Sequence, residues 1–130
     1  MATIAPQTDL ITATVQLYVE GAREGDAEKL RAAFHPEARM WGSLGGQRFD
    51  VPISAMIDML DGKPVDVEGS YVATITSCEQ TEDTAAVTLA EEGFWGTVSF
   101  VDFFSLARMD DEWKIVNKTF VHTGGEPPAG

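Results

Sequence analysis

Residues 18–41 read YVEGAREGDAEKLRAAFHPEARMW, and this stretch decides the fold. It predicts the end of one helix, a tight turn at Gly25, and a second short helix with Asp26 as its N-cap. Pro36 disfavours helical backbone geometry at His35, so we expect the second helix to end there and a strand to follow. Two adjacent helices leave an apolar face that a sheet from the rest of the chain must cover.

The apolar periodicity on either side of Gly25 supports both helices. The first is predicted from residue 9 onward, because apolar residues recur at steps of three or four: Ile11, Val15, Tyr18 and Ala22. The second is expected to bury Ala27, Leu30, Ala33 and Phe34.

The segment after Pro36 predicts a strand over residues 38–44 with a turn at Gly45-Gly46. A third helix is expected to follow, with Asp50 as its cap and Pro52 in its first turn. Its apolar stripe comprises Ile53, Met56, Ile57 and Leu60.

The second half of the chain reads as strands. Residues 71–79 and 84–91 form one predicted hairpin, and residues 97–108 and 112–123 form another. The predicted fold class is α+β, with three N-terminal helices packed on a strongly curved, mainly antiparallel sheet. A chain of 130 residues with 44% hydrophobic residues is expected to form one domain, which we place at residues 8–123. Flexible segments are expected at residues 1–7 and 124–130.

The net charge bears on the classes of partner that we expect, and the cysteine content bears on disulfides and metal sites. A net charge of −12 repels phosphate backbones and anionic lipids, so we expect no nucleic-acid or membrane partner. Cys78 is the single cysteine of the sequence, which excludes an internal disulfide and a cysteine metal site. The start of the chain does not resemble a signal peptide, and a cytoplasmic location is the default expectation.

Several segments of the chain resemble a known superfamily. The opening Tyr18-Val-Glu-Gly, the Phe34-His-Pro-Glu-Ala turn, residues 102–106 and residues 112–120 resemble nuclear-transport-factor-2-like (NTF2-like) domains, a superfamily that includes SnoaL-like and ketosteroid isomerase-like proteins. Within it, the chain is most similar to the bacterial putative lumazine-binding family over residues 8–123. The resemblance implies a cone-shaped α+β fold, a pocket between sheet and helices, and a homodimer formed through the sheet.

Asp102 is the most informative carboxylate. It lies in a largely apolar run, and strand alternation places it on the same face as Val98, Phe100 and Phe104. Burial raises the pKa of an unpaired carboxyl, which is how a general base can be made. Counting from the Asp110-Asp111 turn places Lys118 roughly opposite, so the pair is either a structural ion pair or part of a pocket.

The histidines are the other candidate acids and bases. His35 lies at the turn that ends the second helix, where it can also satisfy backbone groups freed by Pro36. His122 lies near the end of the last strand, either at a pocket mouth or on the surface. These two histidines alone make a poor zinc site, so no metal is expected.

Large apolar side chains could line a pocket, although each is also suited to an ordinary core. We expect the ligand-binding residues to be Tyr18, Trp41, Met56, Trp95, Asp102, Lys118, Phe120 and His122. Simple alternation along the last strand places Lys118 with Val116, Phe120 and His122, opposite Trp113 and Ile115. Apolar groups on both faces favour dimerisation through the sheet.

Three hypotheses for function remain open. The first is a small-molecule-binding protein with an apolar pocket. The second is a cofactor-free isomerase, dehydratase or cyclase that uses Asp102 or a histidine as base and Tyr18 as donor. The third is a protein-interaction domain. Nucleotide- and phosphate-binding motifs and the nucleophile-elbow motif are absent from the sequence, and no cofactor is expected.

Overall fold

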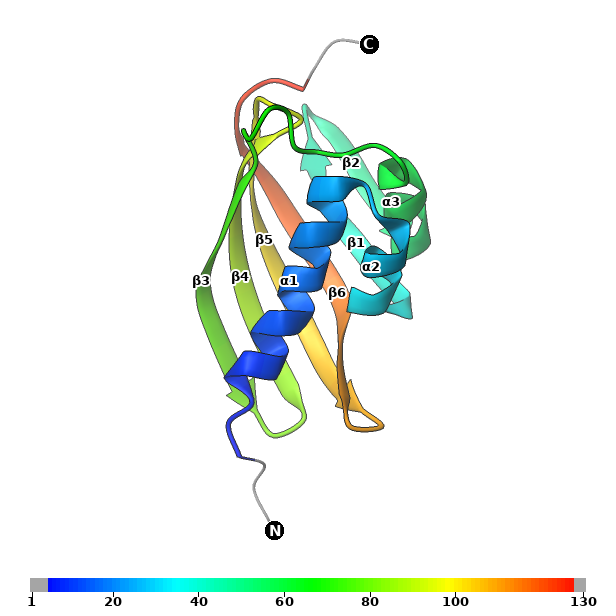
Figure 1. Cartoon of the computed structure of the whole chain (residues 1–130), viewed down its shortest axis with the longest axis vertical. Helices are drawn as coiled ribbons and strands as arrows, with labels where there is room; N and C mark the ends of the chain where they lie inside the picture. The colour runs from blue at the N-terminus through cyan, green and yellow to red at the C-terminus, as the bar shows by residue number, and fades with distance from the viewer. Residues whose placement is uncertain (1–4, 128–130) are drawn as a thin grey trace.

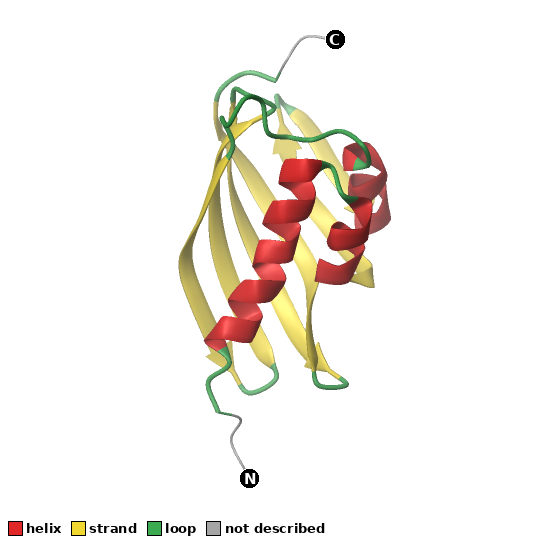
Figure 2. Ribbon diagram, in the orientation of Figure 1, coloured by secondary structure: helices red, strands yellow, loops and turns green. Residues whose placement is uncertain are grey.

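A computed structural model describes residues 5–127 of the protein. Three helices lie on one side of a six-stranded sheet (Figures 1 and 2). In chain order the elements are α1 (Thr8–Glu24), α2 (Ala27–Ala33), β1 (Phe34–Leu44), β2 (Gln47–Pro52), α3 (Ile53–Leu60), β3 (Val72–Thr81), β4 (Thr84–Phe94), β5 (Val98–Met109) and β6 (Glu112–Gly124).

The sheet is mixed, with strand order β2-β1-β6-β5-β4-β3. Strand β1 runs parallel to β6, and every other neighbouring pair is antiparallel. The α+β class is as predicted. The strand predicted over residues 38–44 is part of β1, whereas β2 was not predicted. The expected arrangement of three N-terminal helices is not confirmed, because β1 and β2 lie between α2 and α3 and extend the sheet to six strands.

The turn between α1 and α2 forms as the opening stretch predicts. Gly25 ends α1 in the left-handed conformation, with φ of 69°. A Cβ atom at Gly25 would also lie 2.7 Å from the backbone nitrogen of Lys63, so a side chain has no room there. Asp26 caps α2 by accepting hydrogen bonds from the N–H groups of Glu28 and Lys29, at 3.0 and 3.2 Å.

The start of the third helix differs from the prediction. Strand β2 continues to Pro52, which is itself the N-cap residue of α3. Asp50 is not a cap, since its carboxylate pairs with the guanidinium of Arg39 at 2.8 Å across the β1–β2 hairpin. The apolar stripe of α3 is buried as expected, at Ile53, Met56, Ile57 and Leu60.

A β-bulge in β6 changes which residues face the helices. Leu106 pairs with Ile115 and Ser105 pairs with Asn117, so Val116 has no partner in the register. The extra residue reverses the alternation. Trp113 and Ile115 therefore point to the same buried face as Lys118, Phe120 and His122. The prediction that Trp113 and Ile115 lie on the opposite face from Lys118 is wrong for this reason.

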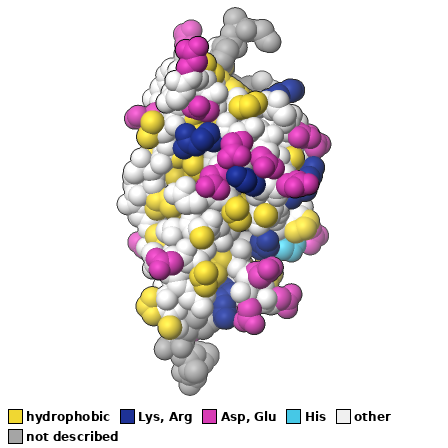
Figure 3. Space-filling model, in the orientation of Figure 1, with side chains coloured by type: hydrophobic (Ala, Val, Ile, Leu, Met, Phe, Trp, Pro, Cys, Tyr) yellow, Lys and Arg dark blue, Asp and Glu magenta, His cyan; other side chains and the backbone are white. Residues whose placement is uncertain are grey.

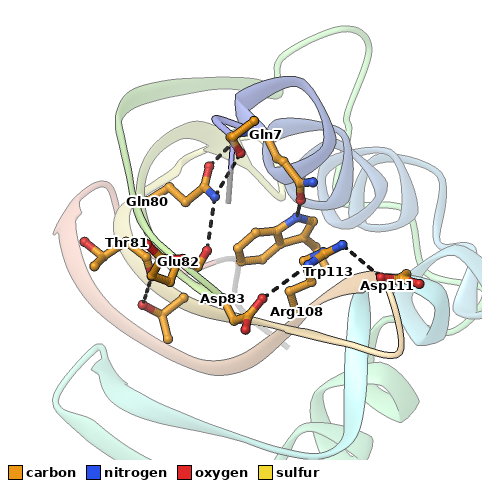
Figure 4. A network of polar contacts seen from close by, with 10 residues as sticks. Gln7, Gln80, Thr81, Glu82, Asp83, Arg108, Asp111 and Trp113 are labelled. Carbon is orange, nitrogen blue, oxygen red and sulfur yellow. Dashed lines mark hydrogen bonds and ion pairs between the residues drawn. The ribbon is translucent and has the colours of Figure 1, made fainter. Parts of the chain in front are cut away.

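Side-chain hydrogen bonds close the end of the sheet where α1 begins (Figure 4). The indole N–H of Trp113 donates to Oε1 of Gln7 at 2.6 Å, and the backbone N–H of Gln7 donates to Oε1 of Gln80 at 2.7 Å. Arg108 pairs with Asp83 in the β3–β4 turn at 3.4 Å. The contacts of Gln7 join the start of α1 to β6 and β3, and the Arg108–Asp83 pair joins β5 to the β3–β4 turn. The opposite end of the sheet is left as the place where a cavity can open.

Acidic side chains are prominent on the helical face of the molecule (Figure 3). Within the described chain, no helix is both long and apolar enough to cross a membrane.

Candidate functional site

An apolar cavity lies between the helices and the inner face of the sheet. About 40 Å³ of this space is open to a water-sized molecule, and side chains fill most of the rest, so a larger ligand would have to displace part of the wall. The helices contribute Tyr18, Met56, Met59 and Leu60 to its wall. The sheet contributes Met40, Leu44, Phe49, Phe100, Lys118 and Phe120, and the end of β4 and the following turn add Phe94 and Trp95.

Aromatic rings make up much of one wall of the cavity. Phe100 packs edge-on against Phe94 and against Phe120, with ring centroids 5.1 and 5.6 Å apart. Trp95 packs edge-on against Phe94 at 4.8 Å. Edge-to-face contacts hold the rings at fixed angles, so this wall is preformed.

Lys118 is the charged group in the cavity wall. Its side chain comes from β6 just after the bulge and is 6% exposed. The ammonium lies 3.8 Å from the sulfur atoms of Met40 and Met56, and 5.1 Å from the ring centroids of Tyr18 and Phe120. Thioethers are weak acceptors, and no described residue forms an ion pair with Lys118. Its N–H groups therefore remain available to a stronger acceptor.

A buried hydrogen-bond network extends from the cavity wall into the core. The hydroxyl of Tyr18 lies 3.2 Å from both carboxylate oxygens of Glu91, and the hydroxyl of Tyr71 donates to Oε2 of Glu91 at 2.5 Å. Glu91 is 1% exposed. Burial, and next the negative charge of Glu91, raise the pKa of both tyrosines, so both stay protonated and act as donors.

Asp102 extends this network, because a hydrogen bond between its carboxyl and that of Glu91 contributes to its raised pKa. It is fully buried, and no described side chain or backbone group donates to either of its carboxylate oxygens. Burial raises its pKa well above the usual value, the charge of Glu91 raises it further, and Lys118 acts in the opposite direction. A protonated Asp102 could donate to Glu91, so the two carboxyls can share one proton.

The strand register explains how these groups come together. Asp102 pairs with Leu89 on β4 and with Phe120 on β6. Glu91 comes two residues after Leu89 and Lys118 comes two residues before Phe120, which makes both of them diagonal neighbours of Asp102, about 7–8 Å away. The predicted direct opposition of Asp102 and Lys118 is replaced by this diagonal arrangement, because the bulge shifts the register.

The structure brings most of the predicted site residues to one region. Tyr18, Met56, Trp95, Lys118 and Phe120 line the cavity, and Asp102 lies buried behind its wall.

Three predicted site residues lie elsewhere. His35 borders a separate surface groove, and its Nδ1 accepts the backbone N–H of Glu37 at 3.0 Å. Nδ1 of His122 accepts a hydrogen bond from the backbone N–H of Gly45 at 3.4 Å, so this ring binds the turn between β1 and β2. Trp41 is 39% exposed on the outer face of the sheet, beneath the guanidinium of Arg39.

Sequence reasoning missed Glu91 and Tyr71. The signal for Glu91 was present, since Ala85, Val87 and Leu89 alternate with period two and the next position of that face is Glu91. Tyr71 carried no comparable signal. It reaches the network because the loop after α3 closes over the end of α1, where Arg23 donates to the carbonyl oxygen of Tyr71 at 2.9 Å.

The described residues contain no group of three or more histidine, cysteine or acidic side chains that could hold a metal ion. The chemistry that the site can perform with its own groups is hydrogen bonding and proton transfer through Lys118, Tyr18 and the buried carboxyls.

Comparison with known proteins gives the relationships of the chain. The family described as "Putative lumazine-binding" matches residues 6–121. A curated protein named aldolase FrzH, from Cladobotryum sp., is 30% identical over 113 residues, which is 86% of this chain and 88% of that protein.

Solved structures share the fold over nearly the whole chain. An NTF2-like protein of unknown function from Methylobacillus flagellatus has 27% identity and a TM-score of 0.83, with 95% of this chain and 99% of that chain covered. One from Shewanella baltica has 22% identity and a TM-score of 0.82, with 96% and 100% covered. A ketosteroid isomerase-like protein from Erwinia carotovora has 15% identity and a TM-score of 0.69, with 93% and 99% covered. The chain belongs to the putative lumazine-binding family of the NTF2-like superfamily.

Proposed function

We propose that this protein binds a small, largely apolar organic molecule in the cavity between α1, α3 and the sheet. The observation that carries the proposal is the cavity wall, which is aromatic and thioether-rich except for the inward-facing Lys118 and Tyr18. Such a wall suits a flat apolar body with one acceptor group. The family description and the fold support the same class of function. The alternative of a pure protein-interaction domain is less favoured, because such a domain does not account for a cavity between the helices and the sheet.

The buried groups indicate how the ligand would be oriented. Tyr18 already donates to Glu91, whereas the ammonium of Lys118 contacts only sulfur atoms and aromatic rings. A carbonyl or ring-nitrogen acceptor on the ligand would therefore be bound by Lys118, and the apolar body would pack against Phe100, Phe120 and Met56. An acceptor that replaces a thioether gains a charge-assisted hydrogen bond.

Ligand screening by thermal shift tests the proposal. The panel contains lumazine and riboflavin, suggested by the family description, and aromatic aldehydes and ketones. A ligand present at about 100 times its dissociation constant stabilises the fold by about 2.7 kcal/mol. Binding should be lost in Met56→Trp, which fills the cavity, and kept in Met109→Trp, a matched change at an exposed position outside it.

Two outcomes would count against binding in this cavity. One is that no compound stabilises the wild-type protein, and the other is that Met109→Trp weakens binding as much as Met56→Trp. If Met56→Trp does not fold, Lys118→Met serves as the second variant, with weaker binding of ligands that carry a carbonyl group as its expected result.

A second candidate function is cofactor-free catalysis of proton transfer at a carbon next to a carbonyl group. Asp102, with no donor to its carboxylate, would be the base, and protons would reach it from the cavity through Lys118 or a water molecule. The relative named aldolase FrzH supports carbonyl chemistry of this type. The test is deuterium incorporation from heavy water into the α-carbon of panel ketones, followed by NMR. Wild type should accelerate it and Asp102→Asn should not, and equal rates in both would remove Asp102 from this role.

A further inference from the structure

We propose that Lys118 binds its ligand covalently, by forming an imine with an aldehyde or ketone that carries an apolar body. The inference rests on the proposed function, since it names the ligand class and the reactive atom of the same cavity.

The surroundings of Lys118 differ from those of the other lysines. Lys29 pairs with the carboxylate of Glu24 at 3.1 Å, and Lys114 donates to the carbonyl oxygen of Ala32 at 2.7 Å. Lys63 is exposed to solvent. Lys118 is buried, and among the described residues its Nζ meets only sulfur atoms and ring faces. Among the described residues, no oxygen atom is hydrogen-bonded to its nitrogen.

Packing alone does not explain a lysine at this position. Burying an ammonium group carries a large desolvation cost, and a methionine or leucine would fill the same space between Met40, Met56 and Phe120 without it. Lysines desolvated in apolar pockets are well suited to covalent attack on carbonyl carbon, because the neutral amine is the nucleophile. A carbonyl group of a ligand bound in the cavity would lie within reach of this nitrogen, because Lys118 forms part of the cavity wall.

The buried carboxyls provide a place for the proton that must leave the amine. In molecules in which Asp102 is ionised, one proton passes from the Lys118 ammonium to the Asp102 carboxylate, through a water molecule or after a rotamer change. The nitrogen lone pair forms a bond to the carbonyl carbon, and the carbonyl π electrons move to oxygen, which takes a second proton from that nitrogen. The resulting hydroxyl leaves as water with the proton returned by Asp102. The net reaction converts a carbonyl compound and an ammonium into a protonated imine and one water molecule.

Tyr18 and Glu91 contact the two groups that exchange the proton, Lys118 and Asp102. The ring of Tyr18 lies beneath the Lys118 ammonium, and its hydroxyl is held by Glu91. Tyr71 donates to the same carboxylate, so Glu91 remains anchored whichever way the Asp102 proton moves. When Asp102 loses its proton, the hydrogen bonds from Tyr18 and Tyr71 therefore still hold the carboxylate of Glu91.

Reductive trapping tests the proposal. The intact protein is incubated with benzaldehyde or acetophenone and sodium cyanoborohydride, and the product is mapped by peptide mass spectrometry. Reduction of an imine adds the mass of the probe less one oxygen atom. We expect modification at Lys118 to be at least about tenfold faster than at Lys29, Lys63 or Lys114, as expected for a carbonyl group held beside the nitrogen.

Lys118→Arg and Lys118→Met are the direct controls. Arginine keeps the charge but does not form a stable imine, and methionine keeps the volume, so both should lose the fast adduct and retain slow labelling of the surface lysines. Asp102→Asn should slow adduct formation without abolishing binding of the probe. Met109→Trp should leave the adduct unchanged.

The outcomes separate this inference from the proposed function. If benzaldehyde stabilises the protein in the thermal-shift assay but labels all four lysines at similar rates, the cavity binds ligands and the imine proposal is wrong. If no panel compound binds and no fast adduct forms, both proposals fail. Fast labelling that persists in Lys118→Arg would assign the reactive amine to another residue and overturn the proposal.

Discussion

At the residue scale, Asp102 is the side chain whose position is hardest to explain by stability. It is buried between β4 and β6, and no described group donates to its oxygens. Leaving a buried acceptor without a partner costs about 1–3 kcal/mol. Lys118 and Glu91 are diagonal neighbours of Asp102 and place a positive and a negative charge beside its carboxyl. Such surroundings suit a group that exchanges protons.

The first prediction concerns the pH dependence of stability. Because the pKa of Asp102 is raised in the folded state, the folded chain retains a proton that the unfolded chain releases. The stability from this proton is complete below the ordinary aspartate value of 3.8 and is lost as pH rises through the folded-state pKa. In urea unfolding from about pH 5 to about pH 8, the free energy of unfolding of wild type relative to Asp102→Asn should decrease with rising pH.

The control for this prediction is Asp110→Asn, which removes one negative charge in the exposed β5–β6 turn. If Asp110→Asn shows the same pH-dependent difference as Asp102→Asn, general charge repulsion explains the effect. At neutral pH we also expect Asp102→Asn to be at least as stable as wild type, because an amide is neutral and can donate to Glu91.

At the element scale, the contact between β1 and β6 positions the cavity wall. Gly42 pairs with Phe120, and a Cβ atom at Gly42 would lie 2.5 Å from both the carbonyl oxygen and a ring carbon of Phe120. The absence of a side chain at Gly42 leaves room for the Phe120 ring, which contributes to the cavity wall.

The second prediction follows from this close approach. Gly42→Ala should destabilise the fold by about 1–3 kcal/mol, because Phe120 must move and its backbone oxygen is part of the sheet. The movement should also weaken binding of any cavity ligand. Chemical denaturation and calorimetric titration measure the two effects.

The matched control is Gly124→Ala on the same strand as Phe120. An added Cβ atom there would meet Ser99 no closer than 3.9 Å, which is an ordinary contact. Comparable losses of stability in Gly42→Ala and Gly124→Ala would mean that loss of chain flexibility or of strand geometry, and not the clash with Phe120, is responsible.

The bulge in β6 shows why the sequence predicted most of the secondary-structure elements but not every residue's side of the sheet. Hairpins and helix ends follow from local signals such as Gly25, Asp26 and the Asp110-Asp111 turn, and these were predicted correctly. A bulge has no such signal in this chain. Since each extra residue reverses the side-chain alternation, one unpredicted bulge at Val116 was enough to misplace Trp113 and Ile115 relative to Lys118.

At the scale of the whole molecule, the outer face of the sheet carries apolar side chains. Phe103 is 59% exposed and Val121 is 50% exposed. Thr119 pairs with both Trp41 and Phe103, which places these two aromatic residues in one row across β1, β6 and β5. Exposed apolar patches of this kind are typical of protein interfaces.

The third prediction is that the protein forms a homodimer through this outer face. Phe103→Asp should convert the dimer to a monomer, because the interface would bury an unpaired charge. Leu10→Asp, at an exposed apolar position on α1, should leave the dimer intact. Size-exclusion chromatography with light scattering measures both. A monomeric wild-type protein at micromolar concentration would contradict the prediction.

Local pattern was sufficient for α1, α2, the β3–β4 and β5–β6 hairpins, the buried position of Asp102 and the family resemblance. Caps, turns and period-two alternation act between near neighbours in the chain, whereas the β1–β2 hairpin and the start of α3 were not predicted correctly. The site itself depended on tertiary structure. Parallel pairing of β1 with β6 puts Met40 beside Lys118, the bulge sets the diagonal from Asp102 to Lys118, and the loop after α3 brings Tyr71 to Glu91. The Tyr71–Glu91 and Met40–Lys118 contacts join residues 20 and 78 positions apart, and packing of the entire sheet against the helices decides them.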